Sequence, residues 1–118
     1  MLARATVTGQ RGAGSVLAVA VLAGIVLLTA IALPAVGMFR ALRQVQAAAD
    51  AAALAAADTL SGRVAGYPCD NASRLAALDG ADVSSCRTDA LIATVAVSAR
   101  YLGVPLTASA RAGPPGSR

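Results

Sequence analysis

The chain has 118 residues and a formal charge of +4, with ten basic residues that are all Arg, six acidic residues that are all Asp, and no His. The absence of His, Lys and Glu removes most groups that act as general bases, nucleophile activators or metal ligands, so we expect no enzyme, metal site, cofactor or small-molecule substrate. The Arg residues are spaced singly and only three aromatic residues accompany them, which argues against a nucleic-acid-binding surface.

Residues 1–15 form a short polar leader that ends in a Gly-rich stretch before Ser15. Such a leader is typical of a signal-peptide n-region, of a cytoplasmic tail, or of a pilin-like precursor that a peptidase processes. In the last case, cleavage is expected at Gly14 and Ser15.

Residues 16–39 are predicted to form a transmembrane helix. Within them, residues 16–33 give eighteen consecutive uncharged positions, which cover most of a ~30 Å hydrocarbon core at ~1.5 Å of rise per residue. Pro34 predicts a kink or a helix end near the membrane boundary. Signal-peptide cleavage after Ala32 is an alternative, but we favour an uncleaved anchor because the apolar run is longer than an ordinary signal core.

Residues 40–62 are rich in Ala and predict a helical stalk that prolongs the anchor. Ala49, Ala52 and Ala56 fall on one helical stripe, and their methyl-sized side chains indicate close packing against a neighbouring helix or sheet. A free-standing solvated helix is the alternative. If the stripe meets partner subunits, replacing the three alanines with Gln is expected to leave membrane insertion intact and to abolish co-purification of those partners.

A short amphipathic helix is predicted within residues 69–80. Gly62 ends the preceding helix, and Asp70 or Asn71 is a candidate cap for the start of the new one. Gly80 supplies the C-terminal cap.

Alternating apolar and polar residues then predict strands. Residues 91–100 and 104–110 alternate with the two-residue period of a half-buried strand and together indicate an antiparallel hairpin. Residues 83–88 are a candidate third strand. Pro105 lacks a backbone donor, so its strand should begin there or lie at the edge of the sheet.

The fold class that follows is α+β, with a long N-terminal transmembrane and stalk helix before a small domain at residues 63–112. Two cysteines, Cys69 and Cys86, lie in this domain, and a disulfide between them would close a loop of about 17 residues and contribute about 3 kcal/mol. Free or metal-binding thiols are the alternative, which the lack of His and of a Cys-x-x-Cys pair disfavours. Residues 113–118 have nothing to bury and are predicted to be disordered.

The basic residues do not decide the orientation in the membrane. Arg4 and Arg11 on one side are balanced by Arg40 and Arg43 on the other, so the positive-inside rule favours neither orientation. A cysteine pair in a small domain is typical of an oxidising compartment, which predicts an extracytoplasmic C-terminal domain and a cytoplasmic leader at residues 1–15.

Four features resemble the TadE/TadG-like proteins of Flp (Tad) pilus assembly, and above all the short TadE-like members encoded in actinobacterial secretion neighbourhoods. They are the leader Arg11-Gly-Ala-Gly-Ser15, the Ala-rich run at residues 40–57, the two cysteines, and the closing Ala110-Arg-Ala-Gly-Pro114. The resemblance implies a pilin-like fold and a minor pilin or pseudopilin, whose partners are the lipid bilayer and other pilus or secretion-system subunits.

The chain departs from this family in one respect. TadE-type sequences commonly carry a Glu early in the apolar segment, whereas Leu17 and Val19 occupy the corresponding region here. In pilin-like assembly that carboxylate pairs with the N-terminus of a neighbouring subunit, so its absence bears on processing at Gly14 and on incorporation into a filament. The second hypothesis is an unrelated single-pass membrane protein that presents a small extracytoplasmic binding domain.

Overall fold

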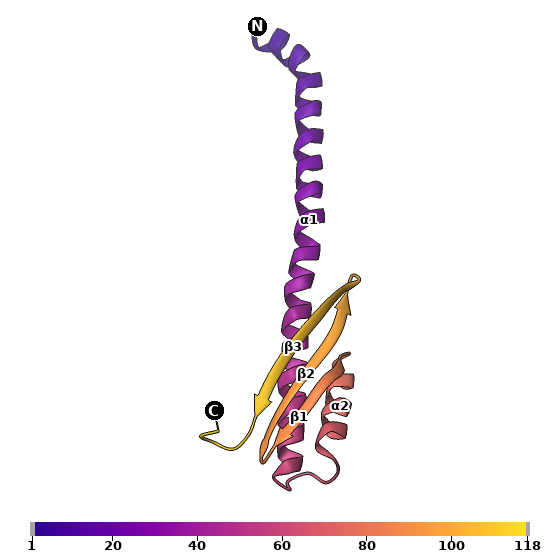
Figure 1. The fold of residues 1–118 in the computed structure, drawn as a ribbon. Helices are drawn as coiled ribbons and strands as arrows, with labels where there is room; N and C mark the ends of the chain where they lie inside the picture. Colours follow the sequence, from indigo (N-terminus) through magenta and orange to yellow (C-terminus); the bar gives the residue numbers. More distant parts are fainter. Residues whose placement is uncertain (1, 118) are drawn as a thin grey trace. The chain divides into compact units, whose positions relative to one another are not determined.

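The computed structural model describes residues 2–117, with side chains from Gly12 onward. Its elements follow in the order α1 (Leu2–Leu60), α2 (Pro68–Leu78), β1 (Asp82–Asp89), β2 (Ile92–Tyr101) and β3 (Val104–Ala112) (Figure 1). A long apolar helix, a short helix and a three-stranded antiparallel sheet make the α+β, pilin-like arrangement that the sequence predicts. The chain divides into two compact units, the first ending at Gly37 and the second beginning at Met38, and each is described by itself.

The first unit consists of the N-terminal part of α1. The helix continues through Pro34 without ending there, so the predicted interruption at this residue takes at most the form of a bend. The side-chain hydroxyl of Thr29 donates a hydrogen bond to the carbonyl oxygen of Ile25 at 2.7 Å. The polar group of this side chain is therefore satisfied by the helix itself, which keeps the surface apolar.

The second unit is built around the C-terminal part of α1 and the sheet. The strands lie in the order β1-β2-β3, and both neighbouring pairs are antiparallel. A bulge between Val83 and Ser85 interrupts the β1–β2 register. Pro105 is the second residue of β3, which is an edge strand, so the missing donor is accommodated as predicted.

The core of this unit lies between one face of the sheet and α1. Val95 and Val97 of β2 are its largest fully buried side chains, and alanines of α1 and α2 fill much of the remainder. Because these side chains are small, the backbones of helix and sheet approach closely, and each apolar contact contributes only a small transfer free energy.

The start of α2 differs from the sequence-based expectation. The helix begins at Pro68 with Tyr67 as its N-cap residue, and no side chain caps it. Proline suits the first helical position because its missing N–H would have no partner there. Neither Asp70 nor Asn71 is therefore the cap. At the other end, Gly80 has φ +73° and allows the chain to leave the helix, as predicted.

The residues after β3 form a turn. The backbone N–H of Ser117 donates to the carbonyl oxygen of Pro114 at 3.2 Å. The sequence predicts disorder for residues 113–118, whereas the structure describes residues 113–117 in this turn, and Arg118 lies outside the described residues. A local hydrogen bond orders the Pro-Pro-Gly segment without burial of apolar surface.

Candidate membrane-spanning segment and domain core

The first unit presents an apolar helix that nothing in that unit covers. Residues 12–37 carry no charged side chain, and no residue in the most apolar window of α1 is buried. At ~1.5 Å of rise per residue this run extends roughly 40 Å, which matches a bilayer of ~40–45 Å including its headgroup regions. By length and composition, α1 contains one segment fit to cross a membrane once or to serve as a signal sequence.

The candidate processing residues lie on this helix. Gly14 and Ser15 are exposed and within α1. A Cβ atom built on Gly14 meets nothing within 4 Å, so packing in this unit gives no reason for glycine at this position. Processing at these two residues stays a prediction. Leu17 and Val19, which stand where the resembling family carries an acid, are also exposed apolar side chains.

The alanine stripe of α1 is part of the core of the second unit. Ala49, Ala52 and Ala56 each have an exposed fraction of 0%, and they belong to the same buried cluster as Val95 and Val97 of β2. The predicted close packing of this stripe is therefore confirmed, but the opposing surface is the sheet of the same chain. The expectation that these three alanines meet a partner subunit is corrected, because their surface is already covered.

Two glutamines of α1 reinforce this packing from either side of the stripe. The Nε2 atom of Gln44 donates to the carbonyl oxygen of Asp79 at 3.1 Å, and Nε2 of Gln46 donates to the carbonyl oxygen of Ser109 at 3.4 Å. The first bond reaches the end of α2 and the second reaches β3. These hydrogen bonds fix the position of α1 against both neighbours at modest energetic gain, since they are exposed.

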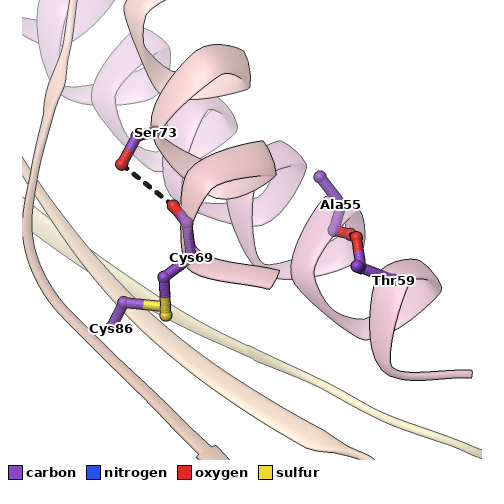
Figure 2. The surroundings of a disulfide bond; sticks show 5 residues. All are labelled: Ala55, Thr59, Cys69, Ser73 and Cys86. Atoms are coloured by element: carbon purple, nitrogen blue, oxygen red, sulfur yellow. Dashed lines mark hydrogen bonds between the residues drawn. A yellow bond between two sulfur atoms is a disulfide. The ribbon is translucent and has the colours of Figure 1, made fainter. Parts of the chain in front are cut away.

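The predicted disulfide is confirmed. Cys69 and Cys86 are bonded with their Cα atoms 5.9 Å apart, and the bond joins the second residue of α2 to β1. Figure 2 shows the bond together with Ser73, whose hydroxyl donates to the carbonyl oxygen of Cys69 at 3.0 Å. Cys86 pairs with Val95 in the sheet, so the covalent link ties α2 to the strand that flanks the core.

Asn71 has a role that the sequence did not indicate. Its Nδ2 atom donates to the hydroxyl of Thr59 at 2.8 Å and to the carbonyl oxygen of Ala65 at 3.1 Å. The hydroxyl of Thr59 in turn donates to the carbonyl oxygen of Ala55 at 2.7 Å. One side chain therefore joins the end of α1, the connecting loop and α2. The sequence gives no signal of this bridge, because Asn71 and Thr59 are far apart in the chain and an Asn near the start of a helix is normally interpreted as a cap.

We expect Asn71→Ala to lower the free energy of unfolding of the second unit by about 1–3 kcal/mol, because it removes two hydrogen bonds, to the Thr59 hydroxyl and to the Ala65 carbonyl. Chemical denaturation of the full chain in detergent micelles measures this change. Ser73→Ala is the matched control, since its hydroxyl is exposed and bonds only within α2, and it should cost less than about 0.5 kcal/mol. Equal effects of the two substitutions would contradict the bridging role of Asn71.

Metal-ligating side chains do not cluster in the part of the chain that the structure describes. No three His, Cys, Asp or Glu residues there lie close enough to hold a metal ion. The ion pair between Arg63 and Asp58, at 3.6 Å, is exposed and contributes little. The features of this protein that call for a functional explanation are thus its exposed apolar helix and the surface of the small domain.

Comparisons with protein-family models, with curated proteins and with solved structures find no match to this chain. The functional argument therefore rests on the two units themselves.

Proposed function

We propose that this protein is a membrane-anchored pseudopilin or minor-pilin-like component of a Tad/Flp-type pilus or secretion apparatus, with a structural or assembly role. The observation that carries the proposal is the double use of α1. In the first unit this helix is apolar and exposed, and in the second unit the same helix forms one wall of the core of a small α+β domain. Pilin-like subunits combine these two uses in one helix, and the sequence resemblance to TadE/TadG-like proteins points to the same class.

The orientation that we propose puts the leader in the cytoplasm and the second unit outside it. The Cys69–Cys86 bond supports this orientation, because disulfides persist in oxidising compartments and are rare in the cytosol. The bond also suits a small domain whose core consists largely of alanine, since such a core supplies little transfer free energy.

The apolar residues at the start of the span bear on the kind of component. Leu17 and Val19 offer no carboxylate to a neighbouring subunit. The proposal therefore includes a stable membrane accessory of the assembly machine as well as a filament subunit.

Replacing residues 16–33 with an unrelated apolar helix of equal length separates this proposal from the second hypothesis. In a pilus or secretion component the span contacts other subunits within the membrane, so the exchange should abolish pilus assembly or secretion in a deletion strain. The wild-type gene should restore it. The measurement is the amount of sheared surface filament or secreted protein, and an alkaline phosphatase fused after Arg118 verifies that topology is unchanged.

Full complementation by the exchanged span would contradict the assembly role of the helix. It would favour a single-pass anchor that presents a binding domain, because such an anchor needs only length and apolar character.

A further inference from the structure

The turn between β2 and β3 lies at the end of the second unit where α1 enters it (Figure 1). Arg100 and Tyr101, which precede the turn, line the same small hollow as Ala41 and Gln44 of α1. Tyr101 and Met38 both pack against the buried cluster. The tip of the hairpin therefore stands beside the first residues of this unit.

Leu102 at the tip is unusual in two respects. It has φ +50° and is followed by Gly103 with φ +78°, so both central residues of this two-residue turn are left-handed. Such turns favour Asn or Gly at the first position, because a larger side chain is strained there. Leu102 is also 73% exposed. The geometry of the turn accounts for the left-handed backbone, but not for an exposed leucine at its first position.

Exposed basic residues lie at this end of the second unit. Arg40, Arg43 and Arg100 are exposed, and none of them forms an ion pair among the described residues. Asp79 lines the same hollow as Arg100, so this end keeps an excess of positive charge. Phe39, 70% exposed, adds an aromatic side chain next to Arg40. Arg side chains near the end of a span can keep their apolar stems in the membrane boundary and their guanidinium groups in water.

The end of the uncharged run marks where that boundary falls. The run ends at Phe39, and the first charged residue after it is Arg40. Ala41, which shares the hollow with Tyr101, is two residues beyond Phe39, or ~3 Å along a helix. This position of the boundary is derived only from residues of the second unit and from the end of the apolar run. That a membrane is present is part of the proposed function, on which this inference rests.

We infer that the β2–β3 turn docks onto the anionic lipid surface of the bilayer that α1 spans. The guanidinium groups of Arg40, Arg43 and Arg100 bind the phosphate groups of the lipids, and Leu102 enters the interfacial layer. Anionic lipid is the occupant because guanidinium groups pair with phosphate oxygens, and the patch combines them with an apolar tip directly after a spanning segment. Docking of the turn holds this end of the second unit against the lipid surface and thereby limits which of its faces other subunits meet.

Single-tryptophan fluorescence tests this inference, because the chain contains no Trp. The full-length Leu102→Trp variant is reconstituted into vesicles of phosphatidylglycerol and phosphatidylcholine, and quenching by lipids brominated near the headgroup is measured. The matched control is Leu91→Trp, an exposed leucine in the turn at the opposite end of β2. Leu27→Trp, within the uncharged run, reports insertion of α1 through quenching by deeply brominated lipids.

We expect quenching of Leu102→Trp and none of Leu91→Trp. Adding Arg100→Gln to the first variant should lower the docked-to-free ratio about five-fold, whereas adding Arg87→Gln, on β1, should not. In vesicles of phosphatidylcholine alone, the Leu102→Trp variant should show a similar loss of docking.

Absence of quenching at Leu102→Trp while Leu27→Trp is quenched would overturn the docking and leave the anchor intact. Equal quenching at both turns would also overturn it, because the whole domain would then lie in the interface. No quenching of Leu27→Trp would remove the span and the docking with it. Pilus assembly is absent from this experiment, so its outcome is separate from the assembly role.

Discussion

Replacing Ala49, Ala52 and Ala56 together with Gln is expected to unfold the second unit of this protein. All three alanines have an exposed fraction of 0% and face the buried side of the sheet. Each larger side chain costs roughly 1–3 kcal/mol in overpacking, and burying its amide without a partner adds to that cost. Three such sites approach the total stability of about 5–15 kcal/mol that is usual for a domain.

Trypsin digestion of the full chain in detergent micelles measures this result. The folded sheet protects Arg87 and Arg100 within β1 and β2, so both sites should be cut rapidly in the triple variant and slowly in the wild type.

The control carries the same substitution at Ala47, Ala51 and Ala55, which are exposed or half-buried and lie outside the buried cluster. This control should remain folded, since Gln keeps most of the helix propensity of Ala. A protected sheet in the buried-site variant would contradict the assignment of these alanines to the core. It would restore the interpretation in which they meet another subunit.

Removing the disulfide is expected to have the second largest effect. Cys69→Ser or Cys86→Ser opens a loop with a sequence separation of 17, which should lower the free energy of unfolding by about 3 kcal/mol. The double variant should be no less stable than either single one, because both substitutions remove the same bond. Thermal unfolding monitored by circular dichroism measures the change.

Reduction provides an independent test. Dithiothreitol should lower the Tm of the wild type toward that of the double variant and leave the double variant itself unaffected. Two free thiols in protein recovered from its native host, detected by mass after alkylation, would contradict a structural role for the bond. They would also remove the argument from the cysteines for an extracytoplasmic domain.

Local patterns in the sequence were sufficient for the elements of this fold. An uncharged apolar run predicts the long helix because its length and composition are visible in consecutive residues, without knowledge of what packs against them. Two-residue alternation predicts β2 and β3 because a half-buried strand exposes every second side chain. The prediction for the start of α2 was wrong because the backbone geometry of a single residue determines which residue is the N-cap. Asp70 and Asn71 are both residue types that favour this position, so the sequence pointed to them.

The sequence by itself determined the apolar helix and the strands, since their patterns lie in consecutive residues, and it showed that one pair of cysteines is present. Only the tertiary structure decided what covers Ala49, Ala52 and Ala56, because small side chains specify a close approach and not the identity of the opposing surface. It likewise decided that Asn71 bridges α1 and α2, and that Tyr101 lies beside Ala41. Those contacts join residues far apart in the chain, and the free energy that selects them is shared among many weak packing terms.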